Sequence, residues 1–188
     1  MFSDVTARPA SAPRWPLGIA LVLAGVLVVG VLIAASVVRS QARDPLGGPA
    51  GGPLRLAALP APSAGAADCV RLLAALPAKL DGGDMGAVER RQLAAPAPAG
   101  AAGWGAPPVV LRCGLDRPAE LTVTSRLLEV SGVQFLETAG SGASTWVAVD
   151  RPVYVLVALP PTSGSGPLQQ IATVIARTLP RRDVDLPS

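Results

Sequence analysis

The sequence predicts an α+β fold class, in which one N-terminal transmembrane helix precedes a small disulfide-stapled domain with a mostly antiparallel sheet packed against two helices. Three observations support this prediction. An uncharged apolar run lies near the N-terminus, apolar residues repeat at helical spacing at both ends of the remaining chain, and short apolar runs separated by turn residues lie between them. Strands grouped together, rather than alternating with helices, are typical of α+β folds.

The apolar run covers residues 16–38, PLGIALVLAGVLVVGVLIAASVV, and contains no charged residue. At about 1.5 Å rise per residue, a helix of this length spans the ~30 Å hydrocarbon layer of a membrane. Trp15 precedes the run and Arg39 follows it, as headgroup-facing residues do at the ends of spans. The alternative is a cleavable signal peptide, because residues 40–42 resemble a small-x-small cleavage site. Signal peptides have shorter apolar cores of roughly 7 to 15 residues, so we expect an uncleaved anchor.

The formal net charge of +3 is unevenly distributed along the 188 residues. Residues 1–65 contain five arginines and two aspartates, whereas residues 66–188 contain eleven basic and eleven acidic side chains. The basic excess therefore flanks the apolar run. Because nucleic acid is bound by a clustered basic excess on a folded surface, the sequence predicts no nucleic-acid partner.

The two cysteines indicate the direction of the span. Two arginines precede the apolar run and two follow it closely, so the positive-inside rule does not decide. Cys69 and Cys113 both follow the run, and an even cysteine count in an exported domain favours a disulfide. The alternative is two buried free thiols in a cytosolic domain. We expect a single-pass protein of the cell membrane, with its N-terminus in the cytoplasm and its C-terminal domain outside.

Composition divides the chain into five segments. Proline, glycine and alanine without helical periodicity mark a linker after the span. The segments are a cytoplasmic tail at 1–15, the transmembrane helix at 16–38, a Pro/Gly/Ala-rich linker at 39–65, an extracytoplasmic α+β domain at 66–181 and a frayed C-terminus at 182–188.

Each helix predicted in the domain has a continuous apolar face. Residues 69–76 place apolar side chains at i, i+3, i+4 and i+7, and Pro77 ends this helix. Residues 168–179 repeat the same spacing, with Ser165 as the expected N-cap and Pro167 in the first turn. The two helices therefore open and close the domain.

Short apolar runs predict the sheet, after a long loop at 81–108 that lacks periodicity. Strands are expected at 109–111 up to Arg112-Cys113-Gly114, at 121–124, at 127–130 and 133–136 around a Ser131-Gly132 turn, and at 145–149 and 153–159 around residues 150–152. Residues 153–159 are apolar on both faces, which predicts a central strand. A Cys69–Cys113 bridge would join the first helix to the first of these strands.

The chain contains no histidine, which removes the commonest general base and the commonest zinc ligand. Ser-His-Asp and Cys-His sites are excluded, and two cysteines cannot form an all-thiolate metal site. Lys79, the only lysine, has no Ser-Lys motif around it. Paired carboxylates at Asp81 and Asp84, or at Asp116 and Glu120, are the remaining route to hydrolysis, but their Gly- and Pro-rich surroundings favour solvated turns. We expect no catalytic residue, no metal and no cofactor.

Three residues are candidates for contact with a partner: Trp104, Arg112 and Arg151. Trp104 lies between two glycines, where it could present an aromatic ring to a glycan or a protein. A position that caps the core beneath the long loop is the favoured interpretation of this residue. Arg112 lies beside Cys113, where a structural ion pair near the bridge is favoured over a partner contact.

Four motifs carry a resemblance: CVRLLAALP at 69–77, WGAPPVVLRCG at 104–114 followed by Pro118, VSGV at 130–133, and RPVYV at 151–155. With these motifs, the layout of residues 15–180 resembles an actinobacterial single-pass membrane protein family that is defined as domain of unknown function family 3515. The resemblance implies a single span and an exported domain. It implies no reaction, and it supplies no site residues.

From these observations we expect a non-enzymatic, membrane-anchored extracytoplasmic protein that serves as an interaction or structural module of the cell envelope. Its partners would be the lipid bilayer, through residues 16–38, and another envelope or membrane protein. The alternative is a small-ligand-binding or carboxylate-based hydrolytic envelope domain. That alternative predicts a concave pocket lined by Trp104 and acidic groups.

Overall fold

The computed structural model describes residues 52–139 and 142–186. The predicted tail at 1–15, the predicted transmembrane helix at 16–38 and the first part of the predicted linker lie outside these residues. Within 52–139 and 142–186, neither helix has the length and apolar character needed to cross a membrane.

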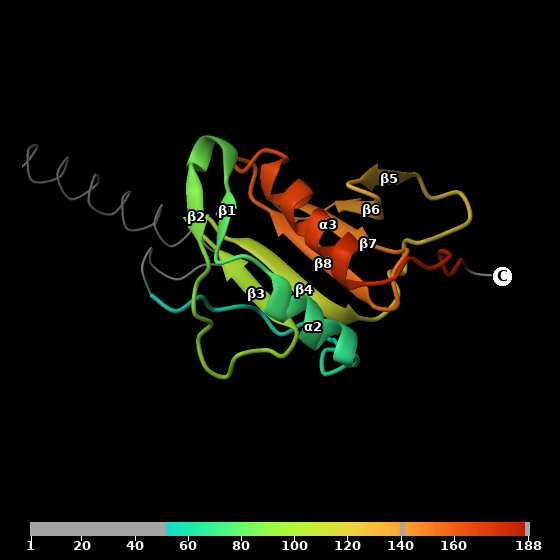
Figure 1. Cartoon of the computed structure of the whole chain (residues 1–188), viewed down its shortest axis with the longest axis horizontal. Helices are drawn as coiled ribbons and strands as arrows, with labels where there is room; N and C mark the ends of the chain where they lie inside the picture. The colour runs from blue at the N-terminus through green and yellow to red at the C-terminus, as the bar shows by residue number, and fades with distance from the viewer. Residues whose placement is uncertain (1–51, 140–141, 187–188) are drawn as a thin grey trace, which may run out of the picture. The chain divides into compact units, whose positions relative to one another are not determined.

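The described chain forms a six-stranded antiparallel sheet with two helices on one face (Figure 1), so the predicted α+β class is confirmed. The spatial order of the strands is β3-β4-β8-β7-β6-β5. A separate two-stranded hairpin, β1-β2, encloses a short 3₁₀ helix, η1. The elements are α2 (Ala67–Ala75), β1 (Lys79–Asp81), η1 (Gly83–Met85), β2 (Ala87–Glu89), β3 (Ala101–Trp104), β4 (Val109–Leu115), β5 (Leu127–Val130), β6 (Val133–Ala139), β7 (Ser144–Ala148), β8 (Tyr154–Leu159) and α3 (Gly166–Thr178).

The main core lies between the helices and one face of the sheet, here called the helical face. Strand side chains alternate between faces, so Val155, Val157 and Leu159 of β8 all point into this core and are buried. The apolar stripes of α2 and α3 supply the other half, including Leu72 and Ile171. Burial of each such side chain stabilises the fold by roughly 1.5 to 3 kcal/mol, which explains why the two periodic helices form where the sequence predicts them.

The opposite side of the sheet, here called the open face, carries a smaller apolar cluster. Leu136 and Val147 are buried there, with Tyr154 and Leu156 of β8 partly buried beside them. Strand β8 lies between β4 and β7 and is apolar on both faces, so the predicted central strand is confirmed. No helix in the described residues packs against this face, and irregular segments cover parts of it.

Residues 52–65 form one of these covering segments, here called the strap. Leu54 is buried against Gly103, where a Cβ would lie 2.3 Å from the leucine Cδ2. Arg112 donates a hydrogen bond to the carbonyl of Ala57. Gly103 and Arg112 alternate with residues of the main core, so the strap crosses the open face. This part of the predicted linker is therefore packed on the sheet.

The strap turns toward α2 at Gly114, where the chain has no room for a side chain. Gly114 has φ +85° beside a register shift in β4, and the N–H of Ser63 donates to its carbonyl at 3.0 Å. A Cβ at Gly114 would lie 2.3 Å from the backbone nitrogen of Ala64. Only glycine fits, because both the positive φ and the close backbone exclude a side chain.

Gly114→Ala is expected to detach the strap and to lower the free energy of unfolding by about 2 to 3 kcal/mol, as measured by urea denaturation. Gly132→Ala is the matched control, because Gly132 also has a positive φ, +77°, but nothing lies within 4 Å of its Cβ position. The control carries the conformational cost alone, about 1 kcal/mol. Equal losses in the two variants would show that the strap does not press on Gly114.

The two predicted hairpins are confirmed. Ser131 and Gly132 both have positive φ, +50° and +77°, as a two-residue type I′ turn requires, and they join β5 to β6. Strands β7 and β8 pair around residues 150–152. Turn residues at both sites fix the register, so alternating side chains reach the intended faces.

The predicted loop at 81–108 is wrong, because it contains β2 and β3 and overlaps the end of β1. These strands have three or four residues, too few to show a period of two. Lys79 and Glu89 pair across the hairpin, Nζ to Oε1 2.7 Å, and this interaction raises the pKa of Lys79. Strand β3 reads Ala-Ala-Gly-Trp, because Leu54 occupies the space above its glycine.

The predicted strand at 121–124 is also wrong, because these residues form a turn. The N–H of Thr122 donates to Ser125 Oγ at 2.9 Å, and the N–H of Ser125 donates to the Thr122 carbonyl at 3.1 Å. Local side-chain bonds of this kind compete with strand pairing. Leu121 is buried while Val123 is 69% exposed, so a turn produces the same alternation as a strand.

Ser165 occupies the N-cap position of α3, but its hydroxyl makes no capping bond. The side-chain amide of Gln169 donates to this hydroxyl at 3.4 Å instead. Pro167 lies in the first turn as predicted. The predicted cap is therefore right in position and wrong in mechanism.

Candidate functional site

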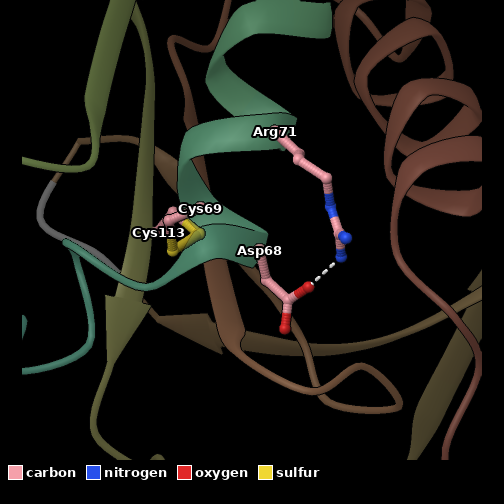
Figure 2. Close-up of a disulfide and its surroundings, with 4 residues drawn as sticks. All are labelled: Asp68, Cys69, Arg71 and Cys113. Carbon is pink, nitrogen blue, oxygen red and sulfur yellow. Dashed lines mark hydrogen bonds and ion pairs between the residues drawn. A yellow bond between two sulfur atoms is a disulfide. The ribbon is translucent and has the colours of Figure 1, made fainter.

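The predicted disulfide is present and joins the first turn of α2 to β4 (Figure 2). Cys69 and Cys113 are both buried in the main core, with a Cα–Cα distance of 5.6 Å. Asp68 and Arg71 form an ion pair on the other side of the helix (Figure 2). Because both sulfurs are enclosed, this bridge is a structural link rather than a reactive one.

Trp104 lies in the interior, at the end of β3. Its exposed fraction is 0%, and its indole Nε1–H donates to the carbonyl of Pro77 at 3.0 Å. The guanidinium carbon of Arg90 lies 5.8 Å from the ring centroid, in cation–π range. This buried position agrees with the core-capping interpretation of Trp104.

The other two predicted contact residues are buried as well. Arg112 lies under the strap, where burial lowers the pKa of its guanidinium, and it donates to Ala57 rather than to an acidic side chain. Arg151 lies in the connection between β7 and β8, and its side chain is 2% exposed. Both arginines bind backbone carbonyls within the fold, and a contact with a partner at either residue stays a prediction.

A buried charge cluster around Asp150 joins three parts of the fold that are distant in sequence. Asp150 Oδ1 accepts the N–H of Gln134 in β6 at 3.1 Å, and Oδ2 lies 2.8 Å from Arg151 Nη1. Arg151 Nη2 also donates to the carbonyl of Gly132 at 2.8 Å. Past α3, the N–H of Arg182 donates to the Asp150 carbonyl at 2.9 Å. The sequence shows these residues only as a turn between strands, and it gives no signal that they are buried.

The open face contains a hollow of about 380 Å³, here called the open-face groove. Its floor comes from four adjacent strands, β4, β8, β7 and β6, and is apolar except for Thr138 of β6. Its rim comes from the strap and from the segment after β4. The groove is defined by Leu115, Val147 and Leu156 on the floor and by Leu59, Asp116 and Glu120 on the rim.

The rim of the open-face groove combines an exposed apolar side chain with unpaired carboxylates. Leu59 is 44% exposed, although large aliphatic side chains are usually buried. Within the part of the chain that the structure describes, Asp116 and Glu120 have no ion-pair partner. An apolar floor and an acidic rim together fit a ligand with an apolar part for the floor and a positive charge for the rim.

A second hollow, of about 450 Å³, lies beside the end of β2 and is here called the arginine hollow. It is defined by Glu89, Arg90, Arg91 and Gln92, with Gly52 of the strap and Gly105 after β3. Neither hollow is lined by Trp104, which the predicted ligand-binding alternative requires.

The predicted carboxylate pairs differ in their surroundings. Asp81 and Asp84 are exposed at the tip of the β1-β2 hairpin, where Asp81 Oδ1 accepts the N–H of Gly83 at 3.1 Å as a turn residue. Asp116 and Glu120 instead share the rim of the open-face groove. Among the described residues, no three acidic or cysteine side chains are grouped so that they could hold a metal ion.

The model of the family described as "Protein of unknown function (DUF3515)" matches residues 21–184. No curated protein and no solved structure matches the chain.

Proposed function

Because the chain belongs to the DUF3515 family of proteins of unknown function, we propose its role from its own geometry. The protein is a membrane-anchored, extracytoplasmic binding module that holds an extended apolar segment of a partner protein in the open-face groove. Within this proposal residues 16–38 are the anchor. The groove, with its apolar floor and acidic rim, is the observation that supports the binding function most directly.

The floor of the groove favours a protein segment over a compact metabolite. Side chains from four adjacent strands lie there, and those of β4, β8 and β7 give an extended chain a row of apolar contacts. Leu59 on the rim would become buried when a segment is bound. An exposed leucine beside an apolar floor is the arrangement expected of a contact surface.

Charge on the rim selects the partner. Asp116 and Glu120 bring two negative charges to the rim of the groove, with no cation paired to them in the described residues. An arginine or lysine next to the apolar segment of the partner would form ion pairs with these two carboxylates. Complementary charges of this kind raise the association rate and exclude partners with acidic flanks.

The proposed location outside the membrane draws on two features of the chain. Residues 16–38 contain no charge and are long enough to span a bilayer. The Cys69–Cys113 disulfide belongs to the class of bonds that persist in oxidising compartments, outside the cytoplasm. With the N-terminus inside, a short connection then leads from the bilayer to the strap.

The groove is tested with two synthetic probe peptides that share a central run of alternating valine and leucine, one flanked by arginines and the other by glutamates. Full-length protein in phosphatidylcholine nanodiscs is expected to bind the arginine-flanked peptide at least about tenfold more tightly, measured by fluorescence anisotropy. The double substitution Asp116→Asn with Glu120→Gln is expected to remove most of this preference, because it keeps the shape of the rim and removes its charge.

Two controls separate the groove from general charge effects. Asp84→Asn with Glu129→Gln removes the same charge from exposed positions outside the groove and is expected to leave the preference intact. Equal affinity for both peptides, or equal effects of the two double variants, would contradict the proposal. The peptide is also expected to be recovered intact by mass spectrometry, because the hydrolytic alternative predicts cleavage that Asp116→Asn abolishes.

A further inference from the structure

The six-stranded sheet has two edges, and the described residues cover one of them. At the β3 edge, the N–H of Arg91 donates to the carbonyl of Gly103 at 2.8 Å. The N–H of Gly105 donates to the carbonyl of Glu89 at 3.0 Å, so residues 89–91 lie along this edge. Strand β5 forms the other edge (Figure 1). Within residues 52–139 and 142–186, no strand pairs with the outer side of β5.

The register with β6 determines which backbone groups of β5 point outward. Val130 and Val133 flank the two-residue turn, so they exchange backbone hydrogen bonds. Bonded and non-bonded pairs alternate along an antiparallel ladder, so Leu128 also bonds to β6. The N–H and C=O groups of Leu127 and Glu129 therefore point away from the sheet. In the described part of the chain, no hydrogen bond joins these outward groups to another segment.

Strand β5 lacks the features that usually protect an edge strand from pairing. Such strands carry lysine, proline or a bulge. Strand β5 reads Leu-Leu-Glu-Val, and its register with β6 has no shift. Leu128 is partly exposed, and neither the main core nor the smaller apolar cluster includes it. An apolar side chain beside outward backbone groups is the arrangement at which a further strand adds to a sheet.

We propose that β5 is a dimer interface, at which β5 of a second copy of this chain pairs antiparallel to it across a twofold axis at Leu128. In this register, Leu127 of one copy lies opposite Glu129 of the other, and each such pair exchanges both of its backbone hydrogen bonds. The two Leu128 side chains lie opposite one another at the axis and cover each other. The two sheets then form one continuous sheet.

The symmetry of the edge favours a second copy as the added strand. The two outward residues, Leu127 and Glu129, lie at equal distances on either side of Leu128, so the donors of one copy meet the acceptors of the other. An axis elsewhere in β5 would leave an outward residue opposite a residue beyond the strand. An axis at Glu129 would in addition place two carboxylates opposite one another, which is destabilising.

The dimer is independent of the open-face groove, because no residue of β5 lines that groove. A strand of four residues offers few hydrogen bonds, so association is weak between copies in solution. Copies anchored in one membrane meet at a higher effective concentration, which favours the dimer there. This last step rests on the proposed membrane anchor.

The test is disulfide crosslinking of the full-length protein in phosphatidylcholine liposomes. Leu128→Cys places two cysteines in a non-bonded pair at the axis, with Cα atoms about 4.5 Å apart, a distance that a disulfide spans. Mild oxidation is expected to convert most of this variant to a covalent dimer, measured on a non-reducing gel. Cys69 and Cys113 do not interfere, because they are buried and bonded to one another.

Two further cysteine variants read the position and the register. Val123→Cys is the exposed control, because Val123 is 69% exposed but lies in the turn before β5. It is expected to give about tenfold less dimer than Leu128→Cys, since its counterpart is beyond disulfide range. Glu129→Cys is also expected to give less dimer, because Glu129 lies opposite Leu127 of the other copy and not opposite its own counterpart.

A backbone substitution tests the pairing itself. Glu129→Pro removes an outward N–H and no bond to β6, so added to Leu128→Cys it is expected to lower the dimer yield about tenfold. Glu129→Gln keeps that N–H and is expected to leave the yield unchanged. The urea midpoints of these two variants show whether the proline variant is folded.

Equal yields from Leu128→Cys and Val123→Cys, or a higher yield from Glu129→Cys, would overturn the proposal, and neither result depends on the proline variant. A folded Glu129→Pro variant that still forms the dimer would also overturn it. Absence of a dimer in the purified protein would assign the β5 edge to some other strand or to none. Peptide binding in the open-face groove is expected to be the same in Leu128→Cys, so failure of one proposal does not count against the other.

Discussion

Replacing both cysteines, Cys69→Ala with Cys113→Ala, is expected to lower the free energy of unfolding by about 4 kcal/mol. The bridge closes a loop over a sequence separation of 44 and restricts the unfolded chain accordingly. In the folded state it holds α2 against β4. Urea denaturation of the full-length protein under non-reducing conditions measures the loss.

Reduction of the unaltered protein provides the control for this variant. If the bridge is responsible, the protein treated with a reductant and the double-alanine variant unfold at nearly the same urea concentration, well below that of the oxidised protein. Coincident curves for the oxidised protein and the double variant would contradict the disulfide. That result would restore the alternative of two buried free thiols in a cytosolic domain.

Asp150→Ala is expected to destabilise the fold by about 3 to 5 kcal/mol, because it leaves the charge of Arg151 buried without its partner. The two side chains are 1% and 2% exposed. The N–H of Gln134 would also lose its acceptor. Removing both charges in Asp150→Ala with Arg151→Met is expected to recover a large part of the loss, and a double-mutant cycle measures the coupling.

An exposed ion pair serves as the comparison for the Asp150 cluster. Glu89→Gln breaks the pair between Lys79 and Glu89, whose side chains are 63% and 69% exposed, and is expected to leave the unfolding midpoint nearly unchanged. If Asp150→Ala were as mild as Glu89→Gln, the Asp150 side chain would not lock β6 to the β7-β8 connection.

Local sequence signals predict much of this fold. The stripes of α2 and α3 repeat every three to four residues over two turns or more, so each helix must bury one face. Ser131-Gly132 marks a tight hairpin, because both residues need positive φ. Strand β8 is apolar on both sides and is indeed central. The residues that determine these elements lie next to one another in the sequence.

The elements that the sequence misses depend on distant partners. Strand β3 contains a glycine at position 103 because Leu54 packs on it, and neither residue indicates this alone. The strap resembles a linker in composition, and only its contacts with Gly114 and Arg112 show that it is packed. The turn at 121–124 imitates strand alternation because Leu121 anchors it in the smaller core.

The candidate sites are predicted less well than the fold for the same reason. The floor of the open-face groove combines Leu115, Val147 and Leu156, which the chain brings together only when β4, β8 and β7 pair. Asp116 and Glu120 stand out in the sequence as a pair of carboxylates, but the apolar floor beside them does not. Arg90 and Arg91 come to line a common hollow only when the strap passes them.

The central claim is that the open-face groove is where this protein contacts its partner. Site-specific photocrosslinking in living cells tests it, with a photoreactive amino acid placed at Leu59 on the groove rim or, as matched control, at Val70 on α2. Both are exposed aliphatic positions, at 44% and 58%, on opposite faces of the sheet.

We predict that Leu59 crosslinks to a protein segment with an apolar run next to arginine or lysine, that Val70 does not, and that Asp116→Asn with Glu120→Gln abolishes the product. Crosslinks of equal yield from both positions, or a Leu59 product that survives the loss of both carboxylates, would contradict the account.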